Sequence, residues 1–547
     1  MNKDSIKKVS KTILFVICSL STIFGLWFIL SCEKLDIKRL IRVQTIDITD
    51  IRSTYAIVYG TILDVGEEGS VEYGHCWSTK KNFTTPDSYT SSEKTSDTLR
   101  FSSMLKDLLP NTDYYVKACA RNSKGYEYGS EIHLETKSIG IEWEVCLGGS
   151  DNEWSKGLAE AKDGSGYFVA GHTFSIDGDV SGHNGDEDAW VVKLDNTGTI
   201  QWQNSLGGSD IEHIEFMAAT SDGGCIIAAN TRSNNGDVTG LHGGTDIWIV
   251  KLNSAGTLEW EKCLGGSNDE DPNWIIQTTD GGYIFTGQSR SNDGDVTGNH
   301  GEYDFWTVKL SSSGEIQWQK CLGGSGNDSG LSIRLTEDDG YILTGRTWSN
   351  DGDVSGNHGE DDFWVVRLDN SGNLLWQKCL GGTGNEGAKC IVRTADKGYL
   401  VTGATTSSDG NISVNKGERD YWIVKLNNYG TILWQNTFGG SLVDQPNSII
   451  ETGDEGCIVA GLSNSDDGDV EGSHGSGDSW IIKLSSSGVL QWQKRLGGSQ
   501  PDDARVIIHT ADDGYLVTGS TWSIDGDVSG NNPGRNQEIW VVKLKEN

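Results

Sequence analysis

Short apolar segments alternate with polar, glycine-rich segments from residue 141 to the C-terminal end of the chain. In the unit at residues 318–375, the apolar runs predict four strands at about residues 330–335, 341–347, 363–368 and 373–380. An Asp-Gly turn joins the first two strands and an Asn-Ser-Gly turn joins the last two, as in antiparallel hairpins. The hydrophobic pattern therefore predicts a four-stranded antiparallel sheet for each unit.

The unit occurs seven times, and two series of tryptophans mark it. The first series keeps a constant spacing except for one extra position between its first two members, and consists of Trp143, Trp202, Trp260, Trp318, Trp376, Trp434 and Trp492. The second series consists of Trp190, Trp248, Trp306, Trp364, Trp422, Trp480 and Trp540. Repeated short strands of this kind predict an all-β fold in which residues 141–547 form a seven-bladed β-propeller.

The two ends of the repeat region predict how the ring closes. The last unit stops after residues 540–544, so its fourth strand is missing, and the region begins with an extra copy of that strand at residues 141–147. We expect the N-terminal strand to complete the last blade, which would leave neither strand with an exposed edge.

The repeat also carries two family resemblances. The segment from Asp195 to Trp202 is similar to the Asp-x-x-Thr-Gly-x-x-x-Trp motif of quinoprotein-type Trp-docking propellers, but it is one residue shorter before the glycine. Because of that departure, the resemblance implies no quinone chemistry for this chain. The Leu-Gly-Gly-Ser and Asp-Gly-Asp-Val strings resemble those of Bacteroidota surface lipoproteins over nearly the whole chain, a resemblance that implies little about function.

The N-terminus predicts the location of the protein. Lysines precede an apolar run at residues 13–30, which ends in Leu-Ser-Cys at Cys32. This resembles a bacterial lipoprotein signal over residues 1–32, and implies that Cys32 is lipidated and followed by a linker at residues 33–42. The alternative is an uncleaved anchor, because the apolar run is almost long enough to span a bilayer. Both place the remainder outside the cytoplasm, and the resemblance implies an outer-membrane lipoprotein that faces the periplasm or the cell surface.

Residues 43–137 show the alternation of strands in a small sandwich. The string from Leu108 to Tyr114 resembles the Leu-x-Pro-x-Thr-x-Tyr corner of fibronectin type III domains, in which the tyrosine hydroxyl bonds to the backbone. The resemblance implies a fibronectin type III-like sandwich that serves as a spacer or as a binding module. Cys76 and Cys119 fall on neighbouring strands of that sandwich, where either a disulfide or two buried thiols would fit.

The net charge and the cysteine pattern exclude several kinds of partner and site. A formal net charge of −34 argues against nucleic acid or an anionic membrane surface as a partner. The eleven cysteines form no Cys-x-x-Cys pair and no Cys/His ligand spacing, so we expect no zinc or redox site. Cys146, Cys263, Cys321 and Cys379 hold the same position in different repeats, and we interpret them as small apolar side chains.

Two acidic series are predicted to converge on one face, because the long connections between strands share that face in a propeller. One acid follows each Leu-Gly-Gly string, at Glu153, Glu212, Glu270, Asp328, Glu386, Asp444 and Asp502. The Asp-Gly-Asp loops contain Asp177, Asp179, Asp293, Asp295, Asp351, Asp353, Asp467, Asp469, Asp525 and Asp527. Such carboxylates suit calcium, which prefers oxygen ligands. The alternative is turn chemistry, in which Asp side chains bond to nearby backbone N–H groups.

A specific site is expected where the repeats differ. The residues that break the pattern are His172, His213, Arg232, Trp274, Arg290, Arg346, Trp348, Trp522 and Arg535. Five of them are predicted at the ends of second strands, on the face with the long loops: Arg232, Arg290, Arg346, Trp348 and Trp522. Arginines and aromatic side chains there suit glycan or peptide binding, and the alternative is packing between blades.

These observations predict a lipid-anchored interaction module that is not an enzyme and that binds a glycan or a surface protein. One alternative is an extracellular polysaccharide hydrolase or lyase. Such an enzyme normally uses a unique pair of carboxylates, whereas the acids here recur in every repeat. The other alternative is a structural subunit of an outer-membrane complex.

Overall fold

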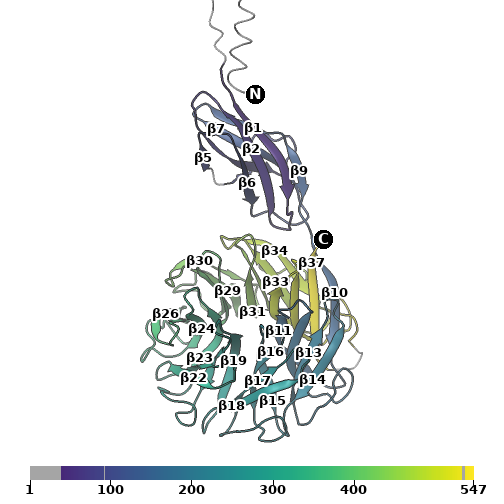
Figure 1. Cartoon of the computed structure of the whole chain (residues 1–547), viewed down its shortest axis with the longest axis vertical. Coiled ribbons are helices and arrows are strands. Elements are labelled where there is room, and N and C mark those ends of the chain that lie inside the picture. The colour runs from purple at the N-terminus through teal and green to yellow at the C-terminus, as the bar shows by residue number, and fades with distance from the viewer. Residues whose placement is uncertain (1–37, 91–92, 532–535) are drawn as a thin grey trace, which may run out of the picture.

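The computed structural model describes residues 38–90, 93–531 and 536–547, which form two all-β bodies (Figure 1). The predictions at Cys32 and Arg535 fall outside these residues. Among the described residues, no helical segment has the length and apolarity needed to cross a bilayer.

The N-terminal body is a sandwich of two sheets. The first sheet consists of β1 (Ile41–Thr49), β2 (Ala56–Val65) and β6 (Leu99–Leu105). The second has β3 (Val71–Ser78) and β7 (Asp113–Asn122) at its centre, with β4 (Ser88–Tyr89), β5 (Glu93–Thr95), β8 (Gly125–Tyr128) and β9 (Ile132–Glu135). The backbone N–H of Leu109 donates a hydrogen bond of 2.9 Å to the Tyr114 hydroxyl, the contact expected of a tyrosine corner. Cys76 and Cys119 are both buried free thiols.

The second body consists of seven four-stranded antiparallel sheets. Their innermost strands are β11 (Glu153–Glu160), β15 (Glu212–Ala219), β19 (Glu270–Gln277), β23 (Asp328–Leu335), β27 (Glu386–Arg393), β31 (Asp444–Glu451) and β35 (Asp502–His509). The second strands are β12 (Tyr167–Thr173), β16 (Cys225–Thr231), β20 (Tyr283–Ser289), β24 (Tyr341–Thr347), β28 (Tyr399–Thr405), β32 (Cys457–Ser463) and β36 (Tyr515–Thr521).

The outer half of each sheet follows the same order. The third strands are β13 (Asp188–Leu194), β17 (Asp246–Leu252), β21 (Asp304–Leu310), β25 (Asp362–Leu368), β29 (Asp420–Leu426), β33 (Asp478–Leu484) and β37 (Glu538–Glu546). The outermost strands are β14 (Ile200–Leu206), β18 (Leu258–Leu264), β22 (Ile316–Leu322), β26 (Leu374–Leu380), β30 (Ile432–Phe438), β34 (Leu490–Leu496) and β10 (Ile139–Leu147).

The sheets close into a propeller-like ring. Each innermost strand contacts the innermost strand of the next sheet, and β35 of the last sheet contacts β11 of the first. Strands such as β14, β18, β22 and β26 lie at the rim, whereas β11, β19 and β31 lie nearer the middle (Figure 1). β10 pairs antiparallel with β37, so the N-terminal strand of this region completes the last sheet, as predicted.

Tryptophans hold each sheet together and join it to the next one. Trp364 on β25 is fully buried, and its indole N–H donates a hydrogen bond of 2.9 Å to Gln377 on β26. Trp318 on β22 packs against Gly372 in the following sheet, where φ is +78° and a Cβ atom would lie 3.0 Å from the indole ring. A side chain at this glycine would therefore strain the backbone and press against the ring.

The ring has two different faces. We call the ends with short connections, such as 161–166 and 195–199, the tight-turn face, and the opposite ends, with connections such as 174–187 and 207–211, the long-loop face.

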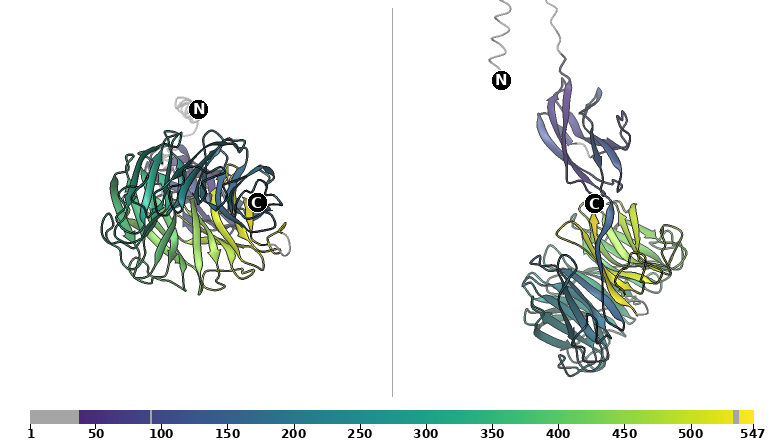
Figure 2. Two further views of the ribbon diagram at one scale, coloured as in Figure 1. Left: turned by 90° about the horizontal axis from the view of Figure 1, so that it is seen from below. Right: turned by 90° about the vertical axis from the view of Figure 1, so that its right-hand side faces the viewer.

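The sandwich contacts the tight-turn face beside the C-terminus (Figure 2, right). Thr54 donates a hydrogen bond of 2.7 Å to Asp454 in one tight turn, and Arg52 forms an ion pair of 2.7 Å with Asp513 in the next. The long-loop face thus carries none of these contacts with the sandwich.

Candidate functional site

A buried acid begins the innermost strand of every sheet. At Glu212, one carboxylate oxygen accepts a 2.7 Å hydrogen bond from the N–H of Gly208, and the other accepts a 2.7 Å bond from the Thr231 hydroxyl. Burial raises the pKa of this carboxyl group above its usual range. Since Gly208 lies in the connection between two sheets, this series of acids fastens each connection to the following sheet.

The ten aspartates predicted as calcium ligands cover the same connections. Each of them accepts a hydrogen bond from a backbone N–H of a Gly-Gly-Ser string. Asp351, for example, accepts from Ser325 at 2.7 Å. In the two repeats that depart from the pattern, Asn235 and Asn411 accept the equivalent bonds at 2.8 and 3.0 Å. The position therefore needs an acceptor rather than a charge, and calcium binding stays a prediction.

The five residues predicted to form a ligand face are spread around the long-loop face. Arg290 forms an ion pair of 2.9 Å with Glu302, and the Arg232 side chain donates a 3.0 Å bond to Thr245. Trp348 is 55% exposed and Trp522 is 43% exposed, so neither ring is packed between sheets. Arg346 lies 3.6 Å from Asp361. Of these five side chains, only Trp522 lines the pocket described next.

A pocket of about 520 Å³ opens on the long-loop face where the last sheet meets the first. It is lined by Trp154, Ser155, Lys156, His172, His213, Leu462, Pro501, Asp502, Asp503, Arg505, Ser520, Trp522 and Gln537. Most of these residues occupy positions that differ from repeat to repeat. The position of Lys156, for example, holds Glu215, Asn273, Leu331, Lys389, Asn447 and Arg505 in the other repeats. Such variation at one repeat position is the sequence signal that marks His172, His213 and Trp522, and it also marks Lys156 and Arg505, which are not among the predicted residues.

Cations gather near this pocket, and two of them, Lys156 and Arg505, line it. Burial, together with the positive charges of Arg346, Arg505, Lys156 and Arg419, lowers the pKa of Lys389 to about 8. These five side chains come from four different sheets, so their charges meet only in the folded ring. Three of these cations also lie close to acids: Lys156 to Glu215, Arg346 to Asp361, and Arg505 to Asp503.

Two histidines and a glutamate meet at one side of the pocket. His172 on β12 and His213 on β15 stack with their ring centroids 4.6 Å apart. Glu187, in the loop before β13, lies 3.2 Å from the Nε2 atom of His172 and 2.5 Å from the Nε2 atom of His213. Burial, followed by the neighbouring His213, lowers the pKa of His172 well below its usual range. The carboxylate thus faces two imidazoles from different sheets.

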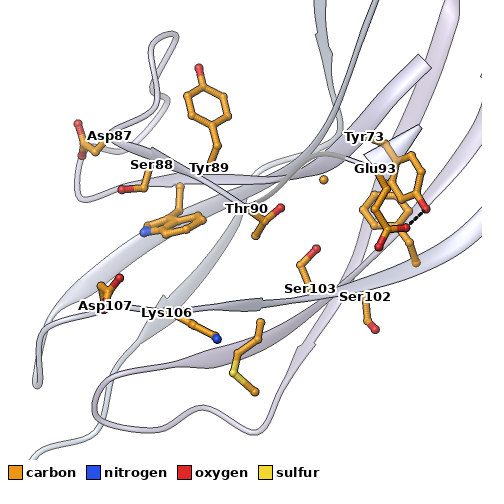
Figure 3. Close-up of a pocket in the computed structure, with 14 residues that line it drawn as sticks. Tyr73, Asp87, Ser88, Tyr89, Thr90, Glu93, Ser102, Ser103, Lys106 and Asp107 are labelled. Carbon is orange, nitrogen blue, oxygen red and sulfur yellow. Dashed lines mark hydrogen bonds between the residues drawn. The ribbon is translucent and has the colours of Figure 1, made fainter. Parts of the chain in front are cut away.

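The sandwich has a pocket of its own, of about 730 Å³, between its two sheets (Figure 3). Tyr73 donates a 2.6 Å hydrogen bond to Glu93 at one end, and Asp87 accepts a 2.7 Å bond from Ser78 at the other. Lys106 and Asp107 lie along the opposite wall (Figure 3). Because these polar groups serve contacts within the sandwich, we take the ring pocket as the candidate site.

The chain shows limited similarity to known proteins. No family model matches the chain. The Regulatory protein FlaEY of Caulobacter vibrioides is 26% identical over 304 residues, which are 50% of this chain and 32% of that protein. The match thus spans about a third of the length of that relative.

Among solved structures, a variant of the Synechocystis apocarotenoid oxygenase is similar, with 11% identity and a TM-score of 0.35 over 84% of this chain and 94% of that chain. A luciferin-regenerating enzyme is similar with 11% identity and a TM-score of 0.30, over 58% of this chain and 87% of that chain. Both are enzymes by name, so we correct the prediction that this chain is not an enzyme, because likeness to such proteins gives no ground for excluding catalysis. At these TM-scores, the likeness transfers no activity, substrate or site residue.

Proposed function

We propose that the chain is a lipid-anchored protein outside the cytoplasm that binds an acidic glycan in the pocket of the ring. In this proposal, Cys32 is the lipidated residue in the outer membrane, the sandwich is a fibronectin type III-like spacer, and the ring is a seven-bladed propeller. The observation that carries the proposal is the gathering of aromatic and cationic side chains, at positions that differ between repeats, in a single pocket.

The chemistry of the pocket supports a sugar ligand. Trp522 offers an exposed aromatic ring, and Trp154 lies at the same opening. Flat aromatic side chains provide a rigid surface for the apolar face of a sugar ring, while a few polar groups fix its orientation. Arg505 is exposed and contacts Asp503 at 2.6 Å through its Nε atom, and the rest of its guanidinium group is the part that would bind a carboxylate or sulfate group on the glycan.

The position of the pocket agrees with an anchored binding protein. The sandwich precedes the ring in the chain, and its contacts with the ring are on the tight-turn face. In the proposed arrangement the pocket on the long-loop face is therefore directed away from the sandwich, where an extended polysaccharide can reach it.

The proposal is tested with the full-length chain in detergent and a panel of neutral and acidic polysaccharides. We expect retention by an acidic polysaccharide, and about tenfold weaker binding for Trp522→Ala and Arg505→Ala, the latter with a reduced dependence on salt. Trp348→Ala is the matched control, because that ring is exposed on the same face but outside the pocket.

Equal loss of binding in Trp348→Ala, or no retention by any acidic polysaccharide, would rule the proposal out. Reducing ends are measured in the same incubation, because their release would show cleavage in addition to binding.

A further inference from the structure

We propose that His172, Glu187 and His213 form a binding site for a divalent transition-metal ion of the Zn²⁺ type. Each residue offers one ligand atom, and the three atoms lie within 4.8 Å of one another. The residues come from β12, from the loop before β13 and from β15, so two neighbouring sheets build the site. The site goes beyond glycan binding and does not require that a glycan binds.

The distances suit a small metal ion. Zinc binds imidazole nitrogen and carboxylate oxygen at about 2.0–2.2 Å, which in a tetrahedral site separates two ligand atoms by roughly 3.3 Å. The Nε2 atom of His172 lies 3.2 Å from Oε1 of Glu187. The Nε2 atom of His213 lies 2.5 Å from Oε2 of Glu187, and a small rotation of the carboxylate brings that pair to the required separation.

Buried polar atoms at this site have no hydrogen bonds within the described part of the chain. His172 and Glu187 are each 3% exposed. Oε1 of Glu187, Nδ1 of His172 and Nε2 of His213 form no hydrogen bond of ordinary geometry among the described residues, although Nε2 of His213 lies 2.5 Å from Oε2 of Glu187. Folded proteins rarely leave buried polar atoms without partners, and a metal ion would supply one to the carboxylate and to the Nε2 atom of His213.

The surrounding charges permit a cation. Lys156 and Arg505 lie near enough to influence His172, but each is paired with its own acid. Lys156 contacts Glu215 at 2.8 Å, and Arg505 contacts Asp503 at 2.6 Å. The carboxylate of Glu187 therefore remains as the negative charge that faces the two imidazoles.

The donor set indicates the kind of metal and the role of the pocket. Two nitrogens and one carboxylate oxygen suit Zn²⁺ and related ions, whereas calcium prefers oxygen ligands alone. Three protein ligands leave a further coordination position. Because His172 and His213 both line the pocket, that position is available to water or to a ligand oxygen.

A second group of possible ligands, His242, Asp246 and Cys263, is better explained as part of the scaffold. His242 forms a 2.8 Å contact with Asp246, and the same contact recurs between His300 and Asp304 at 2.8 Å. Since the arrangement is repeated, it provides a matched control for the unique site.

The test uses the full-length chain in detergent, purified without a histidine tag and stripped of metal with a chelator. Zn²⁺, Co²⁺, Ca²⁺ and Mg²⁺ are each titrated calorimetrically in the absence of glycan. We expect one equivalent of Zn²⁺ or Co²⁺ to bind and to raise the melting temperature, and the Co²⁺ spectrum to lack the thiolate charge-transfer band that a cysteine ligand would give. Binding of Ca²⁺ alone would overturn the assignment in favour of the oxygen-rich loops.

Variants locate the bound ion. His213→Ala and Glu187→Gln should weaken Zn²⁺ binding by at least the roughly 10- to 100-fold seen for outer-shell changes, because they remove ligands. His242→Ala should bind Zn²⁺ as the unmodified chain does. Since His213 is partly exposed, its substitution is expected to leave the fold intact, which circular dichroism checks. Unchanged binding in both site variants, or loss in His242→Ala instead, would overturn the proposal, whatever the outcome of the glycan experiment.

Discussion

The two faces of the ring accommodate buried charge in different ways. On the tight-turn face, a lysine or arginine of the third strand pairs with an aspartate of the first turn in six of the seven sheets. On the long-loop face, the buried acids of the innermost strands accept hydrogen bonds from backbone N–H groups and hydroxyl groups, as Glu212 does. Other buried acids on the long-loop face do form ion pairs, as Asp478 does with Arg495 at 2.9 Å, so the contrast holds for the acids of the innermost strands.

The first sheet shows what the tight-turn pairing depends on. Its turn at residues 161–166 is one residue longer than the equivalent turn at 220–224, which explains the extra position between the first two tryptophans, Trp143 and Trp202. Lys193 in this sheet pairs with no aspartate in the described chain. Its ammonium group lies 4.2 Å from the ring of Phe168, without a hydrogen bond among the described residues. A single inserted residue thus removes the ion pair but leaves the sheet intact.

The largest expected effect comes from breaking a complete pair on the tight-turn face. Lys483 and Asp454 lie 2.9 Å apart, and both side chains are 2% exposed. Lys483→Met should lower the free energy of unfolding by about 3–5 kcal/mol, because it leaves Asp454 as a buried charge without its cation. Chemical denaturation of the full-length chain measures the change.

Lys193→Met is the matched control for that substitution. Since Lys193 is buried without a partner acid, its replacement by an apolar side chain of similar length should be neutral or stabilising. A loss at Lys193 equal to that at Lys483 would show that the lysine stems, rather than the ion pairs, stabilise this face.

A smaller effect is expected on the pH dependence of stability, which should differ between acids on the two faces. On the long-loop face, burial raises the pKa of Asp502 from 3.8 to about 6. Such a carboxyl group holds its proton more tightly in the folded state, so it stabilises the fold below about pH 4 and this contribution is lost as the pH rises to about 6. Asp502→Asn should therefore flatten the dependence of stability on pH between about 4 and 6.

On the tight-turn face, the contribution of the acids to stability changes with pH in the opposite direction. Burial of Asp280 opposes ionisation, but hydrogen bonds from Lys309 and Thr278 outweigh it and lower its pKa from 3.8 to about 2. The stabilisation is present above about pH 4 and is lost as the pH falls towards 2. Asp280→Asn should flatten this acid limb only. Melting curves from pH 2 to 7 test both variants, and the same change of slope in both would contradict the division between faces.

The repeat architecture was predictable because the same pattern of strands and turns recurs in every repeat. The strand predicted at residues 341–347 is β24, and the pairing of β10 with β37 follows from the missing fourth strand of the last unit. The strand predicted at 330–335 begins two residues earlier, at Asp328. The reason is that the buried acid is itself part of the ladder, pairing with Thr347, whereas a charged residue near a glycine string resembles a loop residue.

The pocket was only partly predictable. His172 and His213 stood out because they differ from the equivalent residues, but Glu187 lies in an acidic loop among many other acids. The expectation of no zinc site rested on local spacing of cysteines and histidines. That signal cannot detect ligands on strands of neighbouring sheets, where residues far apart in sequence, such as His172 and His213, stack against each other.

The smallest expected effect concerns the ion pair between the sandwich and the tight-turn face of the ring. Arg52 of the sandwich forms an ion pair of 2.7 Å with Asp513, whose side chain is 53% exposed. An exposed pair of this kind contributes less than about 1 kcal/mol, so a double-mutant cycle of Arg52→Ala and Asp513→Ala should give a coupling energy below that value. Thr54→Val should have a larger effect, because the Thr54 hydroxyl donates to the buried Asp454. A coupling of several kcal/mol between Arg52 and Asp513 would contradict this order. It would mean that the surface pair, rather than the buried contact, holds the sandwich on the tight-turn face and so sets the direction of the pocket.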